Sequence, residues 1–244
     1  MTIGGISLNL RRVLPAVIVI SALALAGCAS SPPPVSEKVQ KAYEAGVTLP
    51  PSPAPVDPLA KGRADGVLST YFIGDSLTDG WNATEQPKSF RPLVAAGLEA
   101  GGKVDATADF KAGANLAQVA ALANIPAAPD LVVLELGTND VNKTDLGAFR
   151  ANLESLLTRL TAAKPVLVCV GTWQFGTTQG FDTQIQQACE ARGGKFVKIG
   201  DLRENPATVA PKGSAVYPLA ADGNHPNDAG HAEIARRVLA ALAP

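Results

Sequence analysis

Hydrophobic and polar positions along most of the chain fall into two alternating patterns. Short runs at 69–73, 131–136 and 165–170 are typical of strands, and 131–136 is nearly continuous apolar sequence, as expected for a strand buried on both faces of a sheet. Between 145 and 163 the large apolar residues recur every three or four positions, which indicates an amphipathic helix. The same alternation continues with strands at 103–110 and 195–199 and helices at 91–99, 116–124, 182–191 and 229–242.

Strands that alternate with helices predict parallel pairing, because each return to the sheet passes through a helix. We therefore expect an α/β fold, with a mainly parallel five-stranded sheet as the middle layer of a three-layer α/β/α domain. Ligands bind such sheets beyond the carboxyl ends of the strands. Ser76, residues 137–140 and Trp173 each follow a strand end and should share this edge. The connection before the last helix has roughly 25 residues, a length that predicts a functional loop.

The N-terminal segment follows a different pattern. Arg11 and Arg12 precede the apolar run 13–26, which at about 14 residues suits the core of a signal peptide better than a membrane span. The run ends in Leu25-Ala26-Gly27-Cys28, which resembles the lipobox of bacterial lipoproteins, where the cysteine is acylated and becomes the new N-terminus. We expect residues 1–27 to be a lipoprotein signal peptide. The alternative is an ordinary secretory signal in which the cysteine is incidental.

A tether is expected between the lipidated Cys28 and the domain. Eight of the 19 prolines lie between Pro32 and Pro58, and large apolar residues are scarce there. Such a segment buries too little surface to offset its ordering entropy, so residues 28–66 are expected to be a Pro-rich tether. Residues 67–244 then form one domain. The resemblance implies a protein held by Cys28 at the membrane of the bacterial cell envelope, and Ala29 resembles the outer-membrane class.

Composition excludes several kinds of partner. The 21 Lys and Arg residues are balanced by 22 Asp and Glu, with no basic stripe, so we expect no nucleic acid. Two histidines and two cysteines besides Cys28 make a metal site implausible, and no phosphate-binding loop is present, so no cofactor is expected. Cys169 and Cys189 could pair in an oxidising compartment. We favour two separate buried thiols, because the geometry between a strand and a helix seldom fits a disulfide.

Two short segments at opposite ends of the domain carry the candidate chemistry. Ser76 follows Gly74 and Asp75 at the end of a strand, where a glycine allows a sharp turn that lifts the hydroxyl clear of the sheet. Asp222 and His225 lie three residues apart before the last helix. Acyl transfer needs a nucleophile, a base and a group that orients the base, and Ser76, His225 and Asp222 supply these in turn.

Two further residues could stabilise a developing oxyanion. Asn139 offers a side-chain amide after the third strand, and Gly113 offers an unhindered backbone N–H after the second. Asn139 could instead be a simple turn former. Asp75 is expected to be a cap or turn residue without a chemical role, and His231 in the last helix a surface or packing residue.

In combination these segments resemble the SGNH, or GDSL, hydrolase superfamily. The matching blocks are 74–78, Gly113, 137–140 and 222–226, and the resemblance covers about 68 to 242. It implies a flavodoxin-like fold, a triad of Ser76, Asp222 and His225, and an oxyanion hole made by Ser76, Gly113 and Asn139. Gly113 is the weakest match because alanines flank it. The G-x-S-x-G elbow of α/β-hydrolases is absent.

The resulting hypothesis is a lipid-anchored serine ester hydrolase without a cofactor. We expect it to prefer short acyl groups on a polar or sugar alcohol, because no apolar insertion follows the strands and the segment 172–180 mixes Trp173 and Phe175 with Gln and Thr. The alternatives are an apolar pocket for longer chains, as in a lysophospholipase or thioesterase, a glycan-binding module without turnover, and a structural lipoprotein. The sequence does not indicate an oligomeric state.

Overall fold

The computed structural model describes residues 57–64, 66–174 and 179–243. The chain divides into two compact units, Met1–Pro53 and Ala54–Pro244, and the described residues all belong to the second. The expected signal peptide, Cys28 and most of the expected tether lie outside the described residues. Within the described part of the chain, no helix has the length and apolar character needed to cross a membrane.

The centre of the folded unit is a five-stranded sheet in which every pair of neighbouring strands is parallel. The strands are β1 (Val67–Gly74), β2 (Lys103–Phe110), β3 (Leu131–Glu135), β4 (Val166–Val170) and β5 (Lys195–Val197). Their order is β2-β1-β3-β4-β5, so β2 lies on one side of β1 and the later strands are added on the other side. The order of the strands therefore reverses between β1 and β3. This order is the flavodoxin-like one, and ligands bind at such reversal points. The predicted fold class is confirmed.

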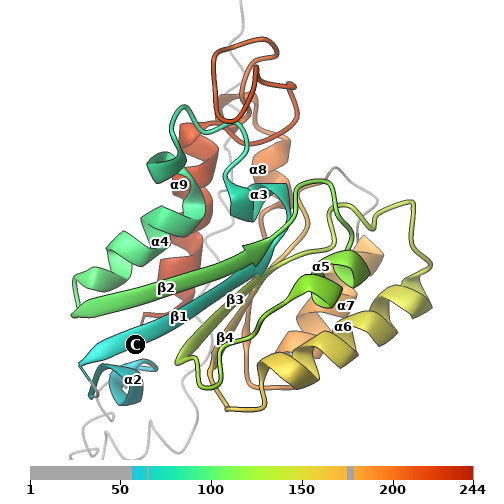
Figure 1. Ribbon diagram of the computed structural model, residues 1–244. Helices are drawn as coiled ribbons and strands as arrows, with labels where there is room; N and C mark the ends of the chain where they lie inside the picture. The colour runs from blue at the N-terminus through green and yellow to red at the C-terminus, as the bar shows by residue number, and fades with distance from the viewer. Residues whose placement is uncertain (1–56, 65, 175–178, 244) are drawn as a thin grey trace, which may run out of the picture. The chain divides into compact units, whose positions relative to one another are not determined.

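Helices cover both faces of the sheet (Figure 1). One face packs on α4 (Phe90–Glu99) and α9 (Asp228–Ala241), and the other packs on α5 (Leu116–Leu122), α6 (Leu146–Leu160) and α7 (Gln179–Glu190), while α2 (Ala60–Ala64) lies at the start of β1. Successive side chains of a strand point to opposite faces, so Phe72 belongs to one apolar cluster and its neighbours Tyr71 and Ile73 belong to the other.

Short elements occupy the connections. They are α3 (Ser76–Asp79), α8 (Gly200–Arg203) and the 3₁₀ turns η1 (Gln86–Lys88) and η2 (Pro206–Thr208). The folded unit also begins earlier than residue 67, because α2 packs at the start of β1 and Leu59 is buried in the core. The end of the segment expected to be tether is therefore part of the domain.

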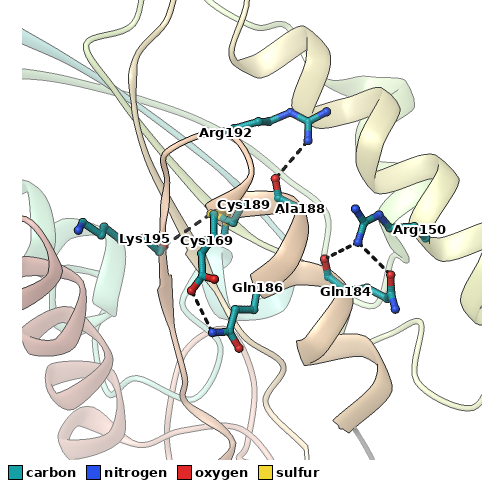
Figure 2. Close-up of a disulfide and its surroundings, with 9 residues drawn as sticks. Arg150, Cys169, Gln184, Gln186, Ala188, Cys189, Arg192 and Lys195 are labelled. Atoms are coloured by element: carbon teal, nitrogen blue, oxygen red, sulfur yellow. Dashed lines mark hydrogen bonds between the residues drawn. A yellow bond between two sulfur atoms is a disulfide. The ribbon is translucent and has the colours of Figure 1, made fainter.

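The two cysteines of the domain form a disulfide, which corrects our preference for separate thiols. Cys169 lies on β4 and Cys189 on α7, and Figure 2 shows the two side chains bonded where the helix crosses the sheet. Their Cα atoms are 6.2 Å apart, within the usual range for a disulfide. The bond is feasible because α7 packs directly on β4, with both cysteines fully buried at the contact.

Candidate active site

Ser76 lies at the sharp turn where β1 meets α3. Gly74 is required at this turn, since a Cβ there would lie 1.8 Å from Thr78 Oγ1 and 2.7 Å from the carbonyl oxygen of Glu135. Asp75 caps α3, because its carboxylate accepts a hydrogen bond from the Leu77 N–H at 3.1 Å. Ser76 is the first residue of α3 and is only 4% exposed, so the turn holds its hydroxyl in a fixed position.

The structure brings Ser76, His225 and Asp222 together. Ser76 Oγ is 2.8 Å from His225 Nε2, and His225 Nδ1 is 2.5 Å from Asp222 Oδ2. The other oxygen of Asp222 accepts hydrogen bonds from Asn82 Nδ2 at 2.9 Å and from the backbone N–H groups of Asn224 and His225 at 2.7 and 3.0 Å. Serine, imidazole and carboxylate therefore form a continuous chain of contacts.

These contacts set the charge of Asp222 and the tautomer of His225. Burial alone would raise the pKa of Asp222, but the Asn224 and His225 N–H groups and the nearby imidazole outweigh it and lower the pKa to about 2. Asp222 is thus ionised at neutral pH and favours a proton on His225 Nδ1. His225 Nε2 is then left as the acceptor for the Ser76 hydroxyl, which is the arrangement that activates a serine as a nucleophile.

The two expected oxyanion donors have different surroundings. Asn139 follows β3, and its Nδ2 donates to Asp75 Oδ2 at 2.9 Å, which places the amide one residue from Ser76. Gly113 lies in the turn after β2, where the Lys111 N–H donates to the Gly74 carbonyl at 3.2 Å. Gly113 has φ +73°, a conformation that favours glycine, although a Cβ there would meet open space. Both lie at the predicted edge of the sheet; among the described contacts, only Asn139 is linked to Ser76, through Asp75.

Trp173 lies at the predicted edge of the sheet, next to Thr138, but its side chain is buried and does not face a substrate. It is only 1% exposed, and its indole N–H donates to the Asn224 carbonyl at 2.7 Å, while its backbone N–H donates to Thr138 Oγ1 at 3.0 Å. Trp173 thus supports the loop that carries His225 and cannot stack on a sugar ring. Phe175 lies outside the described residues.

Trp81 is an aromatic residue of the site that the sequence analysis missed. Its ring is half-buried, with its centroid 5.3 Å from that of His225 and tilted by 48°. Asp79 fixes it, accepting the Trp81 indole N–H on Oδ2 at 3.0 Å and the Tyr217 hydroxyl on Oδ1 at 3.3 Å. Trp81 lies five residues after Ser76 in the same loop, and this proximity was the signal in the sequence that could have identified it.

His231 is a packing residue rather than a surface one. It is fully buried, its Nδ1 accepts the Phe90 N–H at 3.3 Å, and its Nε2 lies 2.9 Å from the Trp81 carbonyl oxygen, to which it donates. Burial lowers its pKa to about 4, so the ring is neutral and ties α9 to the Trp81 loop. Among the described residues there is no group of His, Cys, Asp and Glu side chains suited to holding a metal ion.

Comparison with solved structures gives the fold. A two-domain esterase active on acetylated mannans matches with a TM-score of 0.58 and 20% identity over 75% of this chain and 50% of its own. This chain therefore spans about half of that protein. A catalytic mutant of an acetylxylan esterase from Geobacillus stearothermophilus matches with a TM-score of 0.57 and 20% identity over 72% of this chain and 95% of its own. TesA matches with a TM-score of 0.56 and 20% identity, with 71% and 97% covered.

Comparison by sequence gives the family. No curated protein matches the chain significantly. The model of the GDSL-like Lipase/Acylhydrolase family matches residues 72–233, more than half of the chain, and this range includes Ser76, Asn139, Asp222 and His225. The protein therefore belongs to the GDSL-like lipase/acylhydrolase family.

Proposed function

We propose that the protein hydrolyses carboxylic esters through an acyl-enzyme on Ser76, a proposal that rests on the Ser76–His225–Asp222 chain of contacts. Ser76 Oγ attacks the ester carbonyl carbon while its proton passes to His225 Nε2. The carbonyl oxygen becomes an oxyanion, for which Asn139 and the backbone N–H groups of Ser76 and Gly113 are the donors.

The second half of the reaction restores the enzyme. When the tetrahedral intermediate collapses, the bond to the alcohol oxygen breaks, and the alcohol leaves with the proton that His225 carries. Water then attacks the acyl-enzyme, again giving a proton to His225, and the acid leaves as Ser76 recovers its hydroxyl hydrogen. Asp222 stays ionised throughout and holds the imidazole in position.

The proposed substrate carries a short acyl group, from acetyl to about butyryl, on a polar or sugar alcohol. Trp173 no longer supports this, but Trp81 does, because a half-buried indole beside His225 offers a flat face on which a sugar ring can stack. Two of the similar structures are described as active on acetylated mannans and as an acetylxylan esterase. Longer acyl chains and glycan binding without turnover remain the competing functions.

A series of p-nitrophenyl esters from acetate to palmitate tests the proposal. We expect kcat/KM to be highest at acetate to butyrate, and we expect a folded Ser76→Ala variant to lose several orders of magnitude in kcat. In a pocket for long acyl chains each further methylene would contribute up to about 0.8 kcal/mol of burial free energy, so kcat/KM would rise steadily with chain length. An optimum at octanoate or beyond would therefore contradict the short-acyl proposal. If no ester is hydrolysed and a serine-directed phosphonate does not label Ser76, the protein is a binding module instead.

The proposed location is the bacterial cell envelope, most simply the outer membrane, with the chain anchored through a lipid on Cys28. The motif at residues 25–28 supports this. The Cys169–Cys189 disulfide also supports it, because disulfides persist in oxidising compartments such as the periplasm and are rare in the cytosol.

A further inference from the structure

Glu135 is a buried carboxyl group that the proposed reaction does not use. It is the last residue of β3 and is 0% exposed, with Gly74 of β1 and Val170 of β4 on its two sides. Its Oε2 accepts the Thr78 hydroxyl at 2.9 Å and the Asp75 N–H at 3.3 Å. Its Oε1 has no hydrogen-bond partner among the described residues, which is costly for a buried carboxylate oxygen.

Asp75 lies between Glu135 and the site. It is also fully buried, and its Oδ1 accepts the Leu77 N–H at 3.1 Å and lies 3.4 Å from Ser76 Oγ. Its Oδ2 accepts the Asn139 amide at 2.9 Å. The contacts with the Leu77 N–H and the Asn139 amide need Asp75 as an acceptor, so its ionised form suits the site.

Two adjacent buried carboxyl groups cannot both be ionised without a large repulsion. Burial, and then the charge of Asp75, raise the pKa of Glu135 well above its usual range. Burial raises the pKa of Asp75 to about 6, although the Leu77 N–H and His225 oppose this rise. Above that pH, and until Glu135 loses its proton, the pair carries one proton and one negative charge.

Few titratable groups act on Glu135. Asp75 faces it from the connection between β1 and α3, with His225 on the far side of Asp75. The described neighbours from α3 and β4 are Thr78 and Val170, which carry no charge. The protonation of Glu135 therefore depends mainly on Asp75.

We propose that Asp75 and Glu135 form a carboxyl pair that shares one proton, held by Glu135 and donated to Asp75, and that the pair positions the Asn139 amide for the reaction at Ser76. With this proton Glu135 can donate a hydrogen bond, which would give its buried, unpaired Oε1 a partner. Ionised Asp75 accepts from Asn139 Nδ2 and so fixes which end of the amide carries N–H groups. The second hydrogen of that nitrogen is then free for the oxyanion. The proposal rests on the proposed function, and it makes both carboxyl groups positioning residues.

Infrared spectroscopy of the native protein tests the shared proton without reference to activity. At mildly alkaline pH we expect the carbonyl stretch of a buried protonated carboxyl group, absent from Glu135→Gln. The matched control is Asp140→Asn, which changes another buried carboxylate, one that accepts from the Leu116 N–H and the Thr144 hydroxyl at 2.8 Å each. This variant should keep the band. Absence of the band from the native protein, or its survival in Glu135→Gln, would overturn the proposal.

Kinetics test the positioning role. Loss of the proton from Glu135 places a second negative charge behind the oxyanion, so the kcat of the native protein should fall at alkaline pH. The pH profile of Glu135→Gln should lack this alkaline limb, because the amide of the glutamine remains a neutral donor to Asp75. Glu135→Ala should lower kcat at every pH. Asp75→Asn should lower kcat about 10²–10³-fold with little change in KM, because it no longer fixes the amide of Asn139.

The outcomes separate this proposal from the proposed function. An alkaline limb that is unchanged in Glu135→Gln, or an Asp75→Asn variant with native kcat, would overturn the positioning role while Ser76 is still labelled by a phosphonate. If Ser76 is not labelled, the proposed function fails, and the infrared result still decides whether the pair shares a proton. If Glu135→Gln does not fold, the band of the native protein and its loss at alkaline pH together with kcat decide the question.

Discussion

At the scale of single residues, Asn82 shows how closely the loop after α3 is adapted to the site. Its side chain donates to Asp222 Oδ1 at 2.9 Å, and its backbone N–H donates to the Tyr217 carbonyl at 2.8 Å. Its φ of +66° lies in the left-handed region, which asparagine tolerates better than most residues. Asn82 therefore joins the loop that follows Ser76 to the loop that carries His225.

Replacement of Asn82 by glycine should weaken the support of Asp222 without straining the backbone, because glycine adopts a positive φ freely. A hydrogen bond to a charged group contributes about 1.5–3 kcal/mol, so we expect kcat/KM to fall roughly ten- to a hundredfold. The matched control is Asn142→Gly, which changes an exposed asparagine with φ +61° and should leave kcat/KM unchanged. Equal activities of the two variants in steady-state assays would contradict this role for Asn82.

The sequence revealed the residues that stand in short motifs, and missed those whose role depends on three-dimensional contacts. Ser76 and the Asp222–His225 pair could be identified because turn glycines and a three-residue spacing mark them. Trp173 was placed correctly at the edge of the sheet, but its proposed role in stacking on a sugar was wrong, since a sequence does not indicate whether an aromatic side chain after a strand is buried. Glu135 was overlooked because the proposed role of this acid depends on its contact with Asp75, which lies 60 positions earlier in the sequence.

At the scale of elements, long periodic segments were predicted well and short ones were missed. The strand expected at 103–110 is β2 itself, and the helix expected at 145–163 is α6 (Leu146–Leu160). The helices α2, α3 and α8 have only four or five residues, too few to display a helical period. They form because tertiary contacts hold them, as when Leu59 packs into the core beside α2.

The disulfide between β4 and α7 should stabilise the fold. Its two cysteines are 20 positions apart, and closing a loop of about that size contributes roughly 3 kcal/mol by restricting the unfolded chain. We expect the Cys169→Ala/Cys189→Ala variant to lose about this much unfolding free energy in urea titrations while retaining ester hydrolysis. The native protein should resist mild reduction when folded, because both sulfurs are buried. Equal urea midpoints for the variant and the native protein would show that the bond adds no stability.

At the scale of the whole folded unit, the site and the chain's entry lie at opposite edges of the sheet. Ser76, Asn139 and Gly113 follow the carboxyl ends of β1, β3 and β2. The chain enters through α2, which packs at the amino end of β1 (Figure 1). The described part of the chain therefore begins at the edge of the sheet away from the reacting groups.

A Cys28→Ser variant of the full chain tests the proposed lipid anchor and any contribution of the N-terminal segment to the site. We expect it to lose fatty-acid label in metabolic labelling and to escape lipoprotein-type processing, because the thiol that would carry the lipid is gone. Its kcat/KM on a soluble short ester should equal that of the native protein, since every described contact of the site is made by residues from 75 onward. The matched control is Ser76→Ala, which should keep the label and the lipoprotein-type processing while losing activity. Fatty-acid label that survives in Cys28→Ser would exclude Cys28 as the anchor, and a fall in kcat/KM would mean that the N-terminal segment contributes to the site.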